Sequence, residues 1–362
     1  MKYIDEYRNN EQVRMLVQAI NQTARHPWNI MEICGGQTHA IARYRLEEML
    51  SDKITLLHGP GCPVCVTPVE IIDKALELAL NPNVIFTTFG DMMRVPGTKY
   101  DLLNMKAQGA DVRMLYSTLD AVDLAEKNPE KEVVFFAVGF ETTVPVHLMA
   151  VLEAERRKIS NFSIITSLFT VPPAIDTILS DQDCKVDGFL AAGHVCAVMG
   201  YTEYRPLVEK FHKPIIVAGF EPIDLLYGIY RCVLQLENGL ADIENAYKRI
   251  VSEAGNIKMQ TLMQEMLEPT DQEWRGIGQI PKSGLTLRDR YSRYNALKKF
   301  AGDFEENNIQ KKNVQCIAGA IMKGKKQVVD CPFFRTNCNP ENPIGAPMVS
   351  SEGVCAAYYN YN

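Results

Sequence analysis

Short apolar runs alternate with longer amphipathic segments through most of the chain. Each run is four to six residues long and is bounded by glycine or polar residues, a pattern typical of buried strands. The predicted strands lie at 30–33, 54–57, 84–89, 112–115, 133–138, 162–165, 188–191 and 214–217. Apolar residues spaced for one helical face predict helices at 40–50, 69–80, 144–158 and 204–211. This alternation indicates an α/β fold with parallel sheets and crossover helices.

The predicted strands fall into two groups of four, separated by the charged segment 124–132. Eight strand–helix units also suit a closed barrel, but their spacing is tight for that architecture. We therefore expect two open parallel-sheet, Rossmann-like α/β domains, at 29–130 and 131–238.

After residue 238 the pattern changes to a long helical stretch at 241–266 and then to turn signals at 274–285. This change predicts a smaller, cysteine-rich third domain at 239–362. The segment 1–28 carries an amphipathic helix, which we expect to pack on that third domain.

Composition and charge narrow the class of protein. The 362 residues are 46% hydrophobic and 23% charged, as in a globular protein of more than one domain. The net charge of -6, with scattered basic residues, argues against nucleic acid as a partner. The chain has no long apolar stretch and its amino terminus has no signal core, so we expect a cytoplasmic protein without a membrane segment. Ten cysteines then indicate metal or redox chemistry rather than structural disulfides.

Chemically functional residues follow the first two predicted strands. Cys34 opens the segment CGGQTH, and the loop HGPGCPVC begins at His58 and contains Cys62 and Cys65. Loops at the carboxyl ends of parallel strands can converge on one cleft. A helix amino terminus after Cys34 would lower the pKa of its thiol, which suits a nucleophile or a metal ligand. His39 is close enough in sequence to bond Cys34 or relay a proton.

The CxxC pair has several uses. Cys62 and Cys65 suit a dithiol/disulfide switch, half of a metal site or a pair of nucleophiles, and a purely structural turn is the alternative. Three further residues stand in similar loops. Asp91 and Glu141 either cap the next helix or join the site, and His194 is either a site residue or a structural histidine.

Four cysteines near the carboxyl terminus lie among prolines, with few signals of regular structure. They are Cys316, Cys331, Cys338 and Cys355. A segment with so little core needs a metal to order it, and four thiolates suit either tetrahedral zinc or a cubane iron–sulfur cluster. Of the remaining cysteines, we interpret Cys184 and Cys232 as structural, and Cys196 stays open between the two roles.

Several segments, in this order, resemble the HypD family of hydrogenase maturation factors. They are MEICGGQTHAI, LLHGPGCPVC, FGDMMRVPG, GFETTVP, GHVCAVMG, WRGIGQIPKSGL and SSEGVCAAYY. The resemblance covers essentially the whole chain. It implies two α/β lobes and an iron–sulfur cluster domain, in a protein that joins the small chaperone HypC. The complex would be the scaffold on which the iron centre of [NiFe] hydrogenases receives cyanide and carbon monoxide. Cyanide would come from HypE, charged by HypF, and the hydrogenase large-subunit precursor would be an indirect partner.

The resemblance also implies roles position by position. Cys34 would bind the iron of the Fe(CN)2CO centre together with a cysteine of HypC, with His39 beside it. Cys62 and Cys65 would be the redox-active pair. The four carboxyl-terminal cysteines would bind a [4Fe-4S] cluster. Apart from the resemblance, the candidates for supporting roles are His58, Asp91, Glu141, His194 and Glu352.

The resulting hypothesis is a redox-active assembly scaffold rather than a classical turnover enzyme. Cys34 holds iron, the CxxC pair stores two electrons for cyanide attachment, and the cluster recharges the pair. The main alternative is a stand-alone [4Fe-4S]-dependent thiol/disulfide oxidoreductase acting on a protein partner. A nucleotide-dependent enzyme is a weak alternative, because the chain has no GxxxxGK[ST] or GxGxxG motif. The remaining alternative is a zinc-stabilised interaction protein.

Overall fold

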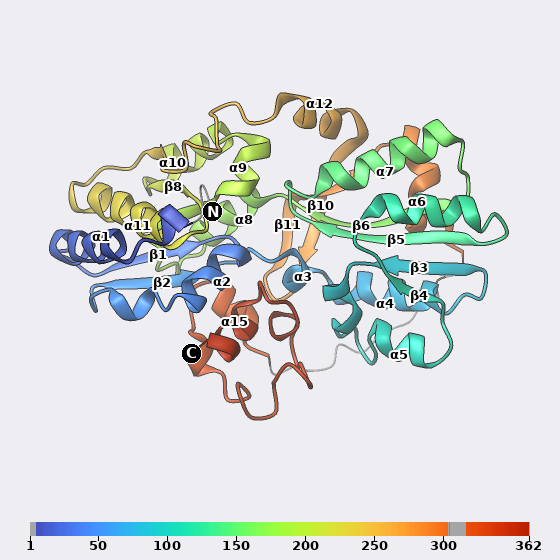
Figure 1. Ribbon diagram of the computed structural model, residues 1–362, viewed down its shortest axis with the longest axis horizontal. Helices are drawn as coiled ribbons and strands as arrows, with labels where there is room; N and C mark the ends of the chain where they lie inside the picture. The colour runs from blue at the N-terminus through green and yellow to red at the C-terminus, as the bar shows by residue number, and fades with distance from the viewer. Residues whose placement is uncertain (1–4, 303, 305–315, 362) are drawn as a thin grey trace.

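Two β-sheets form the framework of the computed structural model, which describes residues 5–302, 304 and 316–361 (Figure 1). Sheet A is parallel throughout, in the order β2-β1-β7-β8-β9. Its strands are β1 (Trp28–Glu32), β2 (Ile54–His58), β7 (Gly188–Ala192), β8 (Ile215–Ala218) and β9 (Ile243–Asn245). Sheet B has the order β10-β11-β6-β5-β3-β4. Its strands are β3 (Val84–Thr88), β4 (Val112–Met114), β5 (Glu132–Gly139), β6 (Phe162–Phe169), β10 (Leu267–Trp274) and β11 (Gly278–Leu287).

All eight predicted strands are present, as β1 to β8. The four strands β4, β3, β5 and β6 are parallel to one another. At the other edge, β11 runs antiparallel to β6, and β10 runs antiparallel to β11. Seven of the eight residues of β5 are buried, as expected for a parallel strand covered by helices on both faces. The α/β fold class is therefore confirmed, with one parallel and one mixed sheet.

The sheets do not follow the boundary expected at residue 130. β1 and β2 pair with β7 and β8, and β3 and β4 pair with β5 and β6, so each sheet draws strands from both halves of the chain. The chain crosses between the sheets after β2, after β6 and after β9. A hydrophobic run identifies a strand but not its neighbour, which is why the sequence pattern did not reveal these crossings.

Helices occupy the predicted positions between strands. Those predicted are α2 (Gly35–Arg43), α4 (Val69–Ala79), α7 (Val144–Arg157) and α10 (Arg205–Phe211). The others among the sheets are α3 (Pro63–Val66), α5 (Leu102–Ala107), α6 (Thr118–Lys127), α8 (Val171–Leu179), α9 (Gly193–Met199), α11 (Pro222–Glu237), α12 (Ile257–Met266) and α13 (Ala296–Lys299). Short 3-10 turns are η1 (Asp5–Arg8), η2 (Glu47–Met49), η3 (Gly90–Arg94), η4 (Thr202–Tyr204) and η5 (Asp289–Tyr294). Within the described ranges, no helix has the length and apolar character needed to cross a bilayer.

The amino-terminal helix α1 (Asn10–Thr23) packs on α11, beside sheet A (Figure 1). Ile20 is fully buried there in one hydrophobic cluster with Leu225 and Ile229 of α11. The prediction that this helix packs on the cysteine-rich domain is therefore wrong. Residues 1–4 of the predicted segment 1–28 lie outside the described residues.

Residues 239–302 belong to the two sheets rather than to a third domain. The predicted long helix at 241–266 is wrong, because β9 joins sheet A and only α12 is helical there. The turn-rich stretch at 274–285 is part of the β10–β11 hairpin, which pairs with β6. The fully buried Trp274 anchors the hairpin by donating from Nε1 to Ser283 Oγ at 2.8 Å. Residues 303, 305–315 and 362 of the predicted domain lie outside the described residues.

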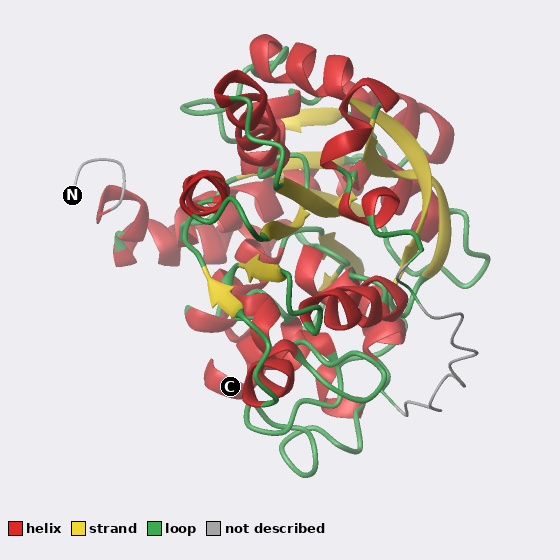
Figure 2. Cartoon of the chain, turned by 90° about the vertical axis from the view of Figure 1, so that its right-hand side faces the viewer, coloured by secondary structure: helices red, strands yellow, loops and turns green. Residues whose placement is uncertain are grey.

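The carboxyl-terminal segment 316–361 has little regular structure and consists mainly of loops (Figure 2). Its short elements are α14 (Ala318–Met322), η6 (Val328–Asp330), η7 (Ala346–Met348) and α15 (Val354–Tyr361). A small cluster of buried side chains, including Ile321, Val354 and Ala357, packs with Ala42 of α2. The segment is thus attached to sheet A below the place where the two sheets meet (Figure 1).

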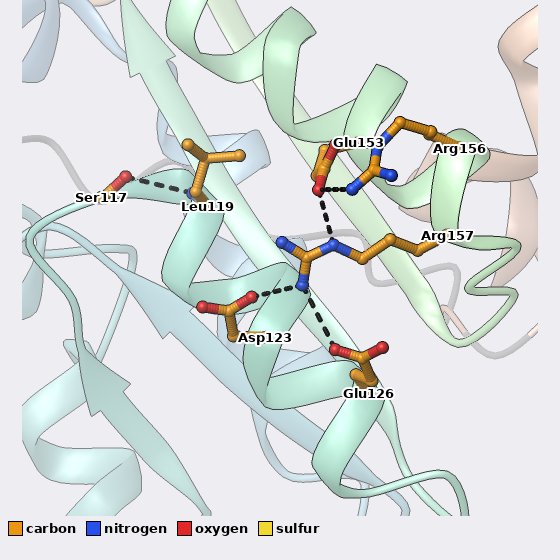
Figure 3. Close-up of polar contacts among 7 residues, drawn as sticks. All are labelled: Ser117, Leu119, Asp123, Glu126, Glu153, Arg156 and Arg157. Atoms are coloured by element: carbon orange, nitrogen blue, oxygen red, sulfur yellow. Dashed lines mark hydrogen bonds and ion pairs between the residues drawn. The ribbon is translucent and has the colours of Figure 1, made fainter.

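An ion-pair network on the outer face of sheet B joins α6 and α7 (Figure 3). Arg157 contacts Glu153 and Asp123 at 2.6 Å each and Glu126 at 3.2 Å. Exposed pairs of this kind contribute little to stability because water screens them. The network therefore marks a solvated face, away from the cysteines.

We predict that Ile20→Ala lowers the stability of the protein by about 2–5 kcal/mol, because it leaves a cavity between α1 and α11. Denaturant unfolding measures this loss. The matched control is Met15→Ala on the same helix, where the side chain is 64% exposed and the expected change is below about 0.5 kcal/mol. Equal effects of both substitutions would contradict the observed packing of α1.

Candidate functional site

Cys34 stands at the turn between β1 and α2 and is 2% exposed. Its backbone N–H donates to Glu32 Oε2 at 2.8 Å, and the next residue, Gly35, donates from N to the Gly61 carbonyl at 2.9 Å. A Cβ on Gly61 would lie 2.2 Å from Cys34 N, so only glycine allows this approach. The Cys34 turn and the loop that leads to the CxxC pair are therefore in direct backbone contact, as the predicted convergence of loops requires.

His194 is the histidine that contacts the Cys34 thiol. The Cys34 Sγ lies 3.7 Å from His194 Nδ1, and the imidazole packs on the ring of Phe220 with centroids 5.1 Å apart. Because β7 is next to β1 in sheet A, the start of α9 brings His194 to the same sheet edge. Burial lowers the pKa of His194 to about 4, so its imidazole is neutral at pH 7.

His39 does not lie beside the Cys34 thiol. Its Nδ1 is 3.0 Å from the Ser351 carbonyl and its Nε2 is 3.4 Å from the Tyr361 hydroxyl, so it binds the carboxyl-terminal segment. The predicted proton relay through His39 is wrong. Five residues along a helix place a side chain about 140° around the axis, which directs His39 to α15 instead.

The pKa of the Cys34 thiol is raised well above its ordinary value, opposite to the expected direction. Burial is the main cause, and the charges of Glu32 and Glu352 add to it. Hydrogen bonds from the backbone of Gln37 and Gly36 act in the expected direction but are outweighed. The free thiol therefore stays protonated at neutral pH, and a metal would have to displace its proton on binding.

A buried polar network lies under this turn. Glu32 accepts hydrogen bonds from His58 Nδ1 at 2.8 Å and from the Thr38 hydroxyl. On its other side, His58 Nε2 is 2.7 Å from the Tyr358 hydroxyl, which donates to Glu47. Burial lowers the pKa of His58, but hydrogen bonds to Glu32 and Glu47 outweigh it and raise the pKa to about 10. A charged imidazolium therefore joins β1 and β2 to α15.

Cys62 and Cys65 are joined in a disulfide, with Cα atoms 5.2 Å apart and side chains only 4% and 2% exposed. Cys62 caps the short helix α3, and Cys65 N donates to its sulfur at 3.3 Å. The pair lies where the chain crosses from sheet A to sheet B, near the middle of the molecule (Figure 1). Of the predicted uses, this geometry favours the dithiol/disulfide switch.

The four carboxyl-terminal cysteines line one small cavity. Its wall also contains the apolar side chains of Ile321, Phe334 and Met348. Burial raises the pKa of Cys316 and of Cys355, and the other cysteines of the set add to this, so the four thiols interact with one another. In the described part of the chain, no three His, Cys, Asp or Glu side chains are grouped to hold a single metal ion. Four thiolates around one cavity suit either tetrahedral zinc or an iron–sulfur cluster.

The cavity adjoins the CxxC helix. The helix α3 packs against η7, whose Pro347 and Met348 line the cavity. The sites that the sequence predicted separately are thus neighbours in the folded protein.

Comparison with known proteins identifies the family of the chain. The model of the HypD family, described as the hydrogenase formation hypA family, matches residues 11–362. The chain belongs to the HypD family. It is 45% identical to hydrogenase maturation factor HypD2 of Bradyrhizobium diazoefficiens, over 100% of this chain and 97% of the relative. Identity to hydrogenase maturation factor HypD is 44% for Rhodobacter capsulatus and 42% for Escherichia coli K12, over 100% of this chain and 98% of each relative.

Other residues predicted for the site of this HypD-family chain have structural contacts. Asp91 accepts a hydrogen bond from the Ser350 hydroxyl at 2.8 Å, and Glu352 N donates to the same hydroxyl at 3.3 Å. These contacts hold the carboxyl-terminal segment close to Cys34. Glu141 accepts from Val171 N at 2.7 Å, so it caps α8, and burial raises its pKa to about 8.

The other three cysteines are free. Cys232 is fully buried on the inner face of α11, in agreement with the structural interpretation. Cys196 is also buried. Burial is the larger cause of its raised pKa, and the charge of Glu141 adds to it. Cys184 is partly buried in the loop before β7 and packs at the margin of a hydrophobic cluster.

Sequence reasoning missed Glu32 and Tyr358. A signal for Glu32 was present, because a carboxylate inside an apolar run such as IMEI is rarely buried unless it has partners. Tyr358 carried no comparable signal, since its partners lie about three hundred residues away in sequence.

We predict that stability falls as the pH rises from about 6.5 to 10, by up to about 1.4 kcal/mol per pH unit. The pKa of His58 is about 10 in the folded protein and lower in the unfolded chain, so its contribution is complete below pH 6.5 and is lost as the pH passes 10. Denaturant unfolding at a series of pH values measures this slope.

In this experiment His58→Gln should flatten the slope. The control His147→Gln should leave it unchanged, because burial lowers the pKa of His147 to about 4 and this side chain does not titrate between pH 7 and 10. An unchanged slope in His58→Gln would contradict the charged state of His58.

Proposed function

We propose that this HypD-family chain is the scaffold on which the iron centre of [NiFe] hydrogenases receives its cyanide and carbon monoxide ligands. Iron, as the cargo, binds Cys34 and a cysteine of the partner HypC. Cyanide comes from HypE, which HypF charges, and the finished centre passes to the hydrogenase large-subunit precursor. The Cys62–Cys65 pair supplies electrons for cyanide attachment, and a [4Fe-4S] cluster in the four-cysteine cavity renews them.

One observation carries this proposal: three cysteine sites form a continuous series of contacts. The Cys34 turn bonds the loop before Cys62 through Gly35 N and the Gly61 carbonyl, at 2.9 Å. The helix α3, which Cys62 caps, packs against η7, whose Pro347 and Met348 line the cavity. A metal ligand, a two-electron switch and a cluster site in this order are what reductive ligand attachment requires.

The environment of Cys34 suits a soft metal with strong-field ligands. Its thiol is almost fully buried, and the neutral His194 imidazole lies 3.7 Å from it. A thiolate is the donor that low-spin iron with cyanide and carbon monoxide favours. A second thiolate, from HypC, completes this donor pair.

The redox step can be written in balance. Release of cyanide from a thiocyanate on HypE breaks the sulfur–carbon bond and consumes two electrons, giving a thiolate and cyanide. The dithiol form of Cys62 and Cys65 gives up two electrons and two protons as it closes to the disulfide seen here. Reopening it takes two electrons and two protons, with the electrons coming ultimately from an external one-electron donor.

The donor set of the four-cysteine cavity supports the proposed cluster. A bound [4Fe-4S] cluster supplies electrons one at a time. Cys316, Cys331, Cys338 and Cys355 would hold it, and the apolar wall would exclude water from it.

The burial of the CxxC pair argues against the alternative of a stand-alone disulfide oxidoreductase. Exchange with a protein partner requires a thiolate to reach one sulfur of the pair, and both are at most 4% exposed. Transfer inside a complex with HypC and HypE avoids this difficulty.

We predict that Cys34→Ala, purified anaerobically with HypC, shows no infrared bands of metal-bound cyanide and carbon monoxide, whereas the unchanged protein shows them. The reason is loss of the iron ligand. The control Cys232→Ala removes a buried thiol outside the site and should keep the bands. Bands of normal intensity in Cys34→Ala would overturn its assignment as the iron ligand.

We also predict that Cys62→Ala and Cys65→Ala leave part of the iron bound but prevent cyanide loading, because neither variant can close a disulfide. The same infrared measurement, with iron determined in parallel, tests this. Normal cyanide bands in both variants would refute the electron store.

Analysis of bound metal and sulfide tests whether the four-cysteine cavity holds a cluster. Cys316→Ala and Cys338→Ala should each lose most of the bound iron and acid-labile sulfide, while Cys184→Ala retains them. Zinc without sulfide in the unchanged protein would favour a structural zinc site instead.

A further inference from the structure

A stack of side chains leads outward from Cys34 along the carboxyl edge of sheet A. The Cys34 sulfur lies 3.7 Å from His194 Nδ1. The His194 ring packs on Phe220 with centroids 5.1 Å apart, and Phe220 is nearly perpendicular to Tyr247 with centroids 6.4 Å apart. The four residues follow β1, β7, β8 and β9, which are neighbours in this order in the sheet. The stack therefore takes one side chain from the end of each successive strand.

Two glycines let the aromatic rings approach the turns of the site. A Cβ on Gly36 would lie 3.3 Å from the Phe220 ring and 3.7 Å from the Cys34 sulfur, so the ring and the sulfur border the same bare position of the backbone. A Cβ on Gly219 would lie 2.6 Å from the Tyr247 ring, so Tyr247 lies directly on the turn that carries Phe220. Phe220 is thus confined between the Cys34 turn, the imidazole and Tyr247.

Tyr247 is held in turn from its outer side. The Arg249 guanidinium lies over its ring, 4.5 Å from the centroid, and donates to Asp224 through Nη1 at 2.5 Å and Nη2 at 2.6 Å. Asp224 is only 4% exposed and lies in the first turn of α11. The Tyr247 backbone N–H donates to Asn245 Oδ1 at 2.9 Å. The outer end of the stack is therefore anchored by polar contacts.

The orientation of the His194 imidazole depends on this packing. The side chain is half-buried, and within the described part of the chain its ring has one polar partner, Cys34. The torsion that turns a histidine ring has broad minima, so one hydrogen bond does not fix the ring. The face of Phe220 covers the imidazole and removes this freedom.

We propose that Phe220, braced by Tyr247, is a positioning residue that holds the His194 imidazole against the sulfur of Cys34. This rests on the proposed function, which makes Cys34 an iron ligand. A metal-bound thiolate can only accept hydrogen bonds, so His194 donates to it from Nδ1. Hydrogen bonds of this kind tune the electron density that a ligand gives to its metal. Phe220 thereby acts on the iron centre through His194.

Infrared spectroscopy of the anaerobic complex with HypC tests this role, because the carbon monoxide band responds to electron density at iron. Loss of the hydrogen bond leaves more charge on the Cys34 sulfur, so iron donates more electron density to carbon monoxide and weakens its bond. In Phe220→Ala and Phe220→Leu we expect the band to move to lower wavenumber and to broaden, while iron stays bound. Phe220→Tyr keeps the ring and should keep the band in place.

A double variant tests whether Phe220 acts through His194. His194→Phe keeps a ring in the stack but removes the nitrogen, so it should move the band in the same direction. Adding Phe220→Ala to it should then cause no further shift.

The matched control is Phe211→Ala. Phe211 is another partly buried phenylalanine at the margin of the same hydrophobic cluster but lies outside the stack, so its loss should leave the band unchanged. A normal band in Phe220→Ala and Phe220→Leu, an equal shift in Phe211→Ala, or a further shift in the double variant would overturn the role of Phe220.

The metal-free protein separates this inference from the proposed function. Histidine is labelled with nitrogen-15, and the ring-nitrogen signals of His194 are assigned by their absence in His194→Phe. The contact with Cys34 favours one tautomer, so we expect one tautomer in the unchanged protein and an average of both in Phe220→Leu. If this response is seen but the unchanged protein has no carbon monoxide band, the proposed function is refuted and the positioning stands. If the signals are the same in both proteins, the positioning by Phe220 is refuted whatever metal the protein binds.

Discussion

The buried carboxylate of Glu32 is the constraint on which the site depends. An unpartnered charge inside a sheet would be very costly, so Glu32 needs a full set of donors. It receives them from Cys34 N, the Thr38 hydroxyl and His58 Nδ1. These bonds fix the turn after β1, the start of α2 and the end of β2 together. Through Tyr358 the same network reaches α15, which follows Cys355, so the carboxyl-terminal segment is positioned by a residue at the other end of the chain.

The crossing of the chain between the sheets explains where the CxxC pair lies. The loop before Cys62 bonds the Cys34 turn on sheet A, and Thr67 just after α3 is 3.0 Å from Ser167 of β6 on sheet B. One end of the short helix is therefore held by sheet A and the other end by sheet B. This mounting buries the disulfide at the junction of the two sheets.

Burial also sets the chemical state of the thiols. Cys34, Cys316 and Cys355 all have raised pKa values, mainly because burial disfavours the charged thiolate. Thiols in this state react slowly with oxidants, yet they become strong donors once a metal displaces the proton. This combination suits the scaffold role proposed above.

Much of the fold and part of the site could be predicted from the sequence. The eight hydrophobic runs determined strands β1 to β8, and the glycine-rich loops after them located Cys34 and the CxxC pair, because these signals are local. Strand partners, the packing of α1 and the β10–β11 hairpin depend on contacts between distant residues, which periodicity does not encode. For the same reason, only the folded chain decided that His194 rather than His39 meets the Cys34 thiol, and that burial raises its pKa. The sequence determined which residues are candidates for the chemistry, and the tertiary structure decided which of them touch and in what charge state, since both follow from burial and long-range packing.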